Sequence, residues 1–209
     1  MESIEAIIRK ASQSLKSVDD FRDLANKIIN NYHIKCGNKG FRFAEIEFYY
    51  YDKNHFNEEW CQKTYPRKDK DAGELFFHYS GVDICFDSSF DKDMAIFGGI
   101  LIRSLYDEER KMYITGSLLC ANEMLNACSK NMVWPVIEET IEHSCVIEAT
   151  GRYGISYSDG YEFKDKLCFY DHQLKVHLIN SIEASTWDYK TESPKKVTRN
   201  YSKRFLNAD

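Results

Sequence analysis

Residues 41–51, with the sequence FRFAEIEFYYY, decide the fold. Apolar and aromatic side chains alternate there with charged or small ones, which predicts a β-strand, although the alternation slips once. Glu45 and Glu47 are two residues apart, so in a strand they share one face among aromatic neighbours. Burial and a like-charged neighbour both raise the pKa of a carboxyl group, as in general bases that work near neutral pH. An edge strand with a hydrated acidic face fits the same pattern, so both interpretations stay open.

Helical and extended segments flank this strand. Apolar residues recur at helical spacing within 3–33, where Ser17 and Asp20 fit a capping box. Residues 52–73 are polar and predict a long loop. Further strands are expected over 75–79, 82–87, 97–105, 145–150, 153–157 and 166–170, and helices over 116–127, 133–143 and 173–185. The pattern predicts one α+β domain over residues 1–209, with N-terminal helices in 3–33, a core in 41–185 and a basic C-terminal tail in 190–204.

The composition is that of a globular protein, and its charge is unevenly distributed. Hydrophobic residues make up 43% of the 209, which excludes a mostly disordered chain. The net charge of −5 argues against a uniformly basic nucleic-acid binder. Residues 190–204 nevertheless hold six basic residues and one acidic residue. Lys195, Lys196 and Arg199 of this tail either bind a phosphate backbone or form a solvated surface.

No cofactor or membrane is expected. The first residues carry scattered charges without an apolar core of signal-peptide length, and no apolar stretch is long enough to span a bilayer. The seven cysteines form no CxxC pair, and the six histidines have no metal-binding spacing. A GxSxG nucleophile elbow is also absent from the sequence. We therefore expect a cytoplasmic protein with no metal or other cofactor.

Six short motifs follow one another along the chain. They are RFAEIEFY (42–49), GELFFHYSG with VDICFD (73–87), GILIR (99–103), GSLLCA (116–121), GRYGI (151–155) and KLCFY (166–170). In this order they resemble the alkyladenine (3-methylpurine) DNA glycosylase family. The resemblance implies a curved, mainly antiparallel sheet with flanking helices, of the formyltransferase C-terminal-like kind. It also implies a monomeric hydrolase that acts on DNA.

The resemblance assigns roles to individual residues. Glu47 would activate the water that attacks the sugar C1′, and Arg103 would position that water or a phosphate. The substrate nucleotide would be flipped out of the duplex, as base-processing enzymes require. The flipped base would lie against aromatic side chains from Tyr49, His78, and either His55 or Trp60.

Two positions depart from the family pattern. Ser80 stands where the family has an intercalating Tyr, and Tyr79 comes one residue too early. Asp87 replaces an Asn that reads the purine edge, and a carboxylate there accepts hydrogen bonds without donating any. Two alternatives follow from these departures. One is a non-catalytic nucleic-acid-binding module on the same fold, and the other is a hydrolase of free nucleosides or small N-glycosides.

Overall fold

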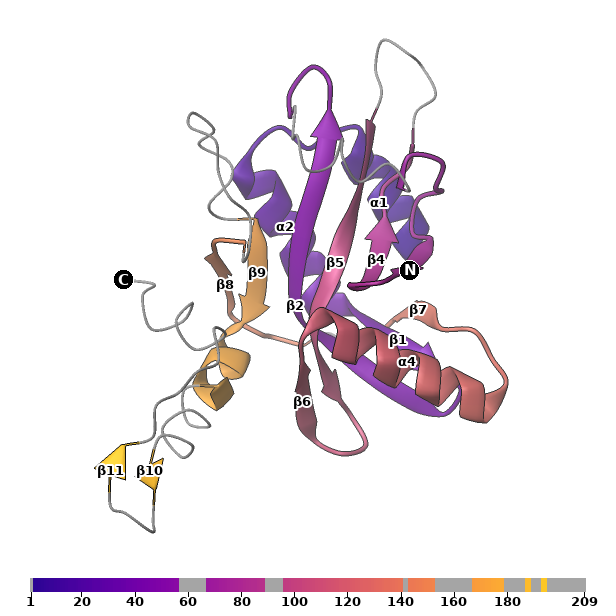
Figure 1. Ribbon diagram of the computed structural model, residues 1–209. Coiled ribbons are helices and arrows are strands. Elements are labelled where there is room, and N and C mark those ends of the chain that lie inside the picture. The colour runs from indigo at the N-terminus through magenta and orange to yellow at the C-terminus, as the bar shows by residue number, and fades with distance from the viewer. Residues whose placement is uncertain are drawn as a thin grey trace.

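The structure, a computed structural model, describes residues 2–56, 67–88, 96–140, 143–152 and 167–178. It also describes the backbone of β10 (Trp187–Asp188) and β11 (Ser193–Pro194), which pair with each other. The predicted strand at 153–157 and most of the tail at 190–204 lie outside these ranges. Helices and a strongly curled antiparallel half-barrel sheet form one α+β domain (Figure 1).

The two N-terminal helices form as the apolar periodicity predicts. They are α1 (Ile4–Ser12) and α2 (Val18–Asn31). Ser17 accepts a hydrogen bond from the backbone of Asp20, whose side chain in turn accepts from the backbone of Ser17, so the predicted capping box is confirmed. The prediction of helix as far as residue 33 is wrong, because Tyr32 begins a strand instead.

The strand predicted at 41–51 is confirmed as the centre of the sheet. It is β2 (Lys39–Asp52), which pairs along its length with β5 (Ile96–Asp107). The register shifts between Phe43 and Ile46, which marks a β-bulge. This bulge explains the slip in the alternation: Phe43 and Ile46 both lie in the apolar core although they are three positions apart, an odd spacing that would otherwise place them on opposite faces.

The remaining strands extend the sheet on both sides of this pair. Its order is β3-β4-β5-β2-β1-β7, with β6 added to β5 and the β8-β9 pair added to β2, and every pairing is antiparallel. The strands are β1 (Tyr32–Cys36), β3 (Leu75–His78), β4 (Gly81–Cys85), β6 (Met112–Thr115), β7 (Val136–Glu139), β8 (Ile147–Thr150) and β9 (Cys168–Asp171).

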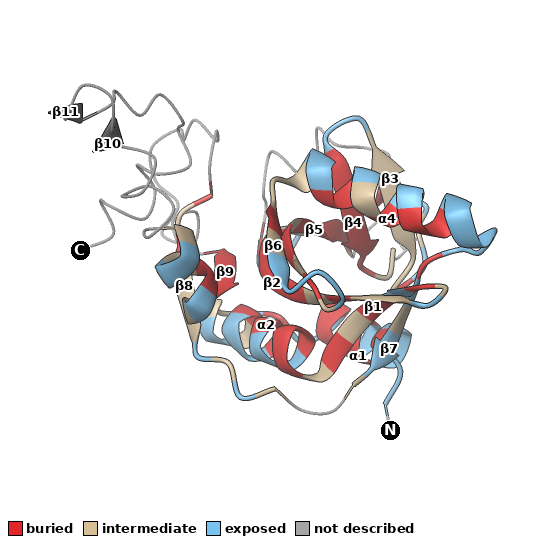
Figure 2. Cartoon of the chain, turned by 90° about the horizontal axis from the view of Figure 1, so that it is seen from below, coloured by how far each residue is buried: buried red, intermediate tan, exposed pale blue. Residues whose placement is uncertain are grey.

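Helices cover both sides of the sheet. One side carries α1 and α2, and the rings of Phe21 and Phe48 meet edge to face there, 5.2 Å apart. The other side carries α4 (Ser117–Asn131), which lies across β4 and β5 (Figures 1 and 2). The predicted helix at 116–127 is therefore confirmed and runs four residues further.

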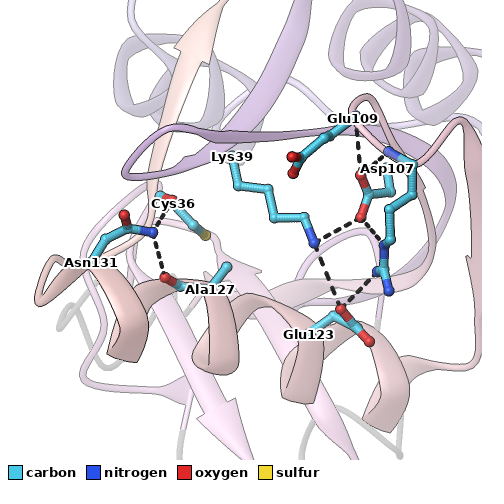
Figure 3. Close-up of polar contacts among 8 residues, drawn as sticks. Cys36, Lys39, Asp107, Glu109, Glu123, Ala127 and Asn131 are labelled. Atoms are coloured by element: carbon cyan, nitrogen blue, oxygen red, sulfur yellow. Dashed lines mark hydrogen bonds and ion pairs between the residues drawn. The ribbon is translucent and has the colours of Figure 1, made fainter.

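A charged network fixes α4 to the sheet (Figure 3). The fully buried carboxylate of Asp107, at the end of β5, accepts hydrogen bonds from Arg110 Nε at 2.5 Å and the Arg110 backbone at 2.9 Å, and pairs with Lys39 Nζ at 2.9 Å. Arg110 also reaches Glu123 of α4 at 2.7 Å. Burial on its own would raise the pKa of Asp107, but these donors lower it to about 2.

The helix predicted at 133–143 is wrong. Met132 adopts the left-handed conformation that ends α4, and Pro135 follows. Residues from Val136 onward then form β7, which pairs with β1. Residues 172–178 are helical, which agrees with the start of the helix predicted at 173–185. No helix among the described residues is long and apolar enough to cross a membrane.

Candidate functional site

Glu47 lies on the sheet face opposite the Phe48 core, and its side chain is completely buried. Its Oε2 lies 3.2 Å from Nη1 of Arg103 on β5, and its Oε1 accepts a hydrogen bond from the hydroxyl of Tyr49. The structure thus brings together three residues that the resemblance grouped. The alternative of a hydrated edge strand is excluded, because β2 has paired neighbours and both of its glutamates are buried.

Glu45 belongs to the same charged cluster, displaced by the bulge. Its carboxylate accepts hydrogen bonds from Ser104 Oγ at 2.7 Å and from Cys168 Sγ at 3.3 Å. Nε of Arg103 lies 3.9 Å from Glu45 Oε1. One guanidinium therefore neutralises two fully buried carboxylates, which would otherwise carry a large desolvation penalty.

Tyr49 lies at the edge of the cluster and is partly exposed. Burial first, and then the charge of Glu47, raise the pKa of its phenol well above the ordinary value. The hydroxyl therefore stays protonated and donates to Glu47. The guanidinium groups of Arg67 and Arg152 lie over its ring, 5.5 and 5.4 Å from the centroid. The ring expected to stack on a base thus also contacts two cations.

A second acidic centre lies along the same face. The pairing register places Glu47, Leu101 and Asp83 in one row across β2, β5 and β4. Asp83 is fully buried and accepts a hydrogen bond from Arg67 Nε at 2.5 Å. His78 Nε2 lies 3.4 Å from the same oxygen. His78 is therefore near the site, where its ring stacks on Phe76 and its buried Nε2 makes no hydrogen bond to Asp83.

Two predicted residues lie at the tip of the β3-β4 hairpin. Tyr79 and Ser80 connect the two strands, and both are exposed. The side chain of Tyr79 is 94% exposed, so its ring projects into solvent. This position is compatible with contact to a macromolecule.

Other predicted residues are not brought to Glu47. β4 ends at Cys85, and Asp87 beyond it turns to α1, where Arg9 Nε lies 3.3 Å from its Oδ2. The contact of Asp87 is thus with α1, and its role in reading a purine edge stays a prediction. His55 lies in the turn after β2, and its Nδ1 is 2.8 Å from Asp52. Asp52 itself is five residues, or about 17 Å of strand, from Glu47. Trp60, Lys195, Lys196 and Arg199 lie outside the described residues.

Sequence reasoning missed three members of the charged face: Arg67, Asp83 and Arg152. Asp83 did carry a signal, because it interrupts the apolar run VDIC of a predicted strand. Arg152 donates from Nη1 to the Phe48 carbonyl at 3.1 Å. It lies in the GRYGI motif, which was used for the family resemblance but not assigned a role in the site. Arg67 follows Pro66 in a polar segment, and nothing in its pattern distinguishes it from neighbouring charges.

A groove of about 360 Å³ lies between α1 and α2. Its lining mixes Lys10 and Lys27 with Asp20 and Asp23. Because these helices cover the face opposite Glu47, this groove is separate from the charged face. No group of three or more metal-binding side chains occurs in the part of the chain that the structure describes.

Comparison of the chain with known protein families, curated proteins and solved structures found no match. Function is therefore argued from the charged face itself, defined by Glu45, Glu47, Asp83 and the three arginines Arg67, Arg103 and Arg152. Such a face offers carboxylates for water activation or charge stabilisation, and guanidinium groups that bind anions.

Proposed function

We propose that the chain is a DNA N-glycosylase-like hydrolase on a fold of the alkyladenine DNA glycosylase type, removing a modified purine. The observation that carries the proposal is the buried Glu47, held between Arg103 and Tyr49. The stability of the strand does not require this carboxylate, since proteins in which a buried ion pair is replaced by apolar residues of similar volume are often equally stable.

In this mechanism Glu47 acts as the general base. The water that it orients attacks C1′ while the bond to the purine breaks, and Glu47 accepts the proton. The negative carboxylate also stabilises the positive charge that develops on the sugar. Arg103 orients Glu47 and offsets the charge of its carboxylate, because Nη1 of Arg103 lies 3.2 Å from Glu47 Oε2. Tyr49 contacts the flipped base, and Arg67 and Arg152 attract the phosphate backbone.

The tip of the β3-β4 hairpin supports a duplex substrate. Base flipping costs a few kcal/mol, and proteins that open duplexes often insert an apolar side chain between base steps. Ser80 is too small for this role. Tyr79, one residue earlier and 94% exposed, supplies a ring at the same tip.

The test is release of free base from DNA that contains 3-methyladenine or hypoxanthine, single-stranded or duplex. We expect Glu47→Gln to lower the rate by about 10²-fold or more, because the amide cannot accept the proton. Asp107→Asn is the matched control, since it removes another fully buried carboxylate outside the charged face. Absence of base release from every substrate by the folded wild-type protein would refute the proposal.

A non-catalytic nucleic-acid-binding module is the second candidate. The complete burial of Glu47 and its pairing with Arg103 favour it, because these contacts also satisfy the carboxylate without any substrate. This candidate predicts DNA binding that weakens steeply with salt, no base release, and the same affinity in Glu47→Gln. Competition by free nucleosides in the release assay identifies the remaining alternative, hydrolysis of small N-glycosides.

A further inference from the structure

The outer face of α4 is nearly uncharged and exposes three leucines. The inner face of this helix buries Cys120, Met124 and Cys128 against the sheet, and the side that points away from the sheet is largely exposed (Figure 2). The exposed residues of α4 are Leu118, Leu119, Asn122, Leu125, Asn126, Ser129, Lys130 and Asn131. Only Lys130 among them is charged. A helix with apolar residues on opposite sides is normally buried on both sides, so this outer face is that of a covered helix.

The outer face of α2 differs from that of α4 and is typical of a hydrated helix. Its exposed residues are Asp19, Arg22, Asp23, Asn26 and Lys27, of which four are charged and none is apolar. Two copies of a chain with a net charge of −5 repel each other. Because the outer face of α4 exposes no fully solvated acidic residue, two copies can approach there at little electrostatic cost.

The apolar surface continues beyond the end of α4. Met132 is 92% exposed, Trp134 is 65% exposed, and Val133 between them is also exposed. The Trp134 ring meets Phe77 of β3 edge to face, 5.8 Å apart, which holds the indole in place. With the three leucines these side chains expose roughly 600 Å² of apolar area, since a large side chain presents about 150–250 Å² when fully exposed. A stable interface buries about 800 Å² per partner, of which about two-thirds is apolar in homodimers, so the area is sufficient for a dimer.

The spacing along the helix makes this face complementary to itself. Leu118, Leu125 and Met132 recur every seven positions, so they follow one line along α4 with Leu125 at the centre. We propose that the outer face of α4 binds the same face of a second copy of the chain, with the two helices antiparallel and Leu125 at the two-fold axis. Leu118 of each copy then contacts Met132 of the other, as a two-fold interface requires. The dimer departs from the monomer that the family resemblance implies.

The start of α4 favours the antiparallel orientation. Ser117 Oγ donates to the Ser80 carbonyl at 2.7 Å, so the tip of the β3-β4 hairpin lies beside the first turn of the helix. Antiparallel packing places the two hairpin tips at opposite ends of the helix pair, whereas parallel packing would bring them together. It also places the N-terminal end of each helix dipole beside the C-terminal end of the other.

The experiment measures the mass of the full chain in solution by sedimentation equilibrium. We expect twice the chain mass of 24.5 kDa. Leu125→Glu should raise the Kd of the dimer about 10²-fold or more, because it places two like charges at the axis. Val176→Glu is the matched control and should leave the Kd unchanged, because Val176 is 38% exposed, close to the 40% of Leu125, and lies in residues 172–178 outside this face.

Cysteine crosslinking tests the orientation of the two helices. A mixture of Leu118→Cys and Met132→Cys chains, treated with a mild oxidant of thiols, should form disulfides between the two variants, located by mass spectrometry. Leu118→Cys alone should form no bond between its two introduced cysteines. A chain that stays monomeric at about 100 µM, a dimer that Leu125→Glu leaves intact, or a bond between two copies of Leu118→Cys would overturn the proposal. None of these results depends on whether the protein releases bases from DNA.

Discussion

The two faces of β2 form two different interiors. Ile46, Phe48 and Tyr50 point to one side, where Phe21 of α2 packs against the rings of Phe48 and Tyr50. Glu47 and Tyr49 point to the other side, where arginines replace the apolar contacts. Both faces are buried, yet one is held together by area removed from water and the other by paired charges.

This difference separates the contacts that stabilise the fold from those that hold charged groups in place. Apolar burial stabilises a fold without specific partners, at about 25 cal/mol per Å². A buried ion pair adds little net stability over an apolar replacement, but it becomes costly when one partner is removed. The charged face is therefore a poor way to stabilise a sheet and an efficient way to hold reactive groups in place.

Breaking the charged face at its shared cation should have the largest effect. Arg103→Met leaves Glu45 and Glu47 buried without the guanidinium that contacts both. We expect the free energy of unfolding to fall by about 5 kcal/mol, measured by urea denaturation. Adding Glu47→Gln to this variant should restore part of the loss, because one uncompensated charge is removed. A loss below about 1 kcal/mol would show that Arg103 does not neutralise the pair.

Breaking the apolar face should cost slightly less and leave the chemistry intact. Phe48→Ala removes a fully buried ring that contacts Phe21, Phe86 and Phe169. We expect a loss of about 3–4 kcal/mol from the transfer term and the cavity left behind. Base release per folded molecule should stay close to the wild-type value. A selective loss of activity at full stability would show instead that the two faces are not separable.

Local patterns in the sequence were sufficient to predict the apolar face. Helical periodicity and the Ser17–Asp20 capping box predict α2. The alternation in 41–51 predicts β2, and the irregularity in that alternation lies at the β-bulge. Each of these features depends on residues close together in the chain. The core residues on these elements follow directly from such periodicities.

The charged face was predicted only in part, because it depends on pairing between distant strands. Glu47 and Arg103 come together only when β2 and β5 align, and the resemblance supplied that pairing. The role of Asp87 came from the resemblance alone, and β4 ends two residues before it, at Cys85. Asp83, on the strand itself, is the carboxylate that lies in the row with Glu47.

The smallest effect on the free energy of unfolding is expected at Asp107, a buried carboxylate outside the charged face with which Glu47 can be compared. It is as buried as Glu47 but serves only to fix α4 and the end of β5 (Figure 3). Its donors lower the pKa from 3.8 to about 2, so the stability that it contributes is fully present above pH 4 and is lost as the pH falls toward 2.

Asp107→Asn should cost about 2 kcal/mol of the free energy of unfolding at pH 7 and remove that part of the acid sensitivity. Urea denaturation from pH 7 to pH 2 tests this, and a variant with the wild-type pH profile would show that the network is not what holds α4. If the same comparison on Glu47→Gln gives a smaller loss at pH 7, then Glu47 contributes less to stability than an equally buried carboxylate, which is the signature of a residue kept for chemistry.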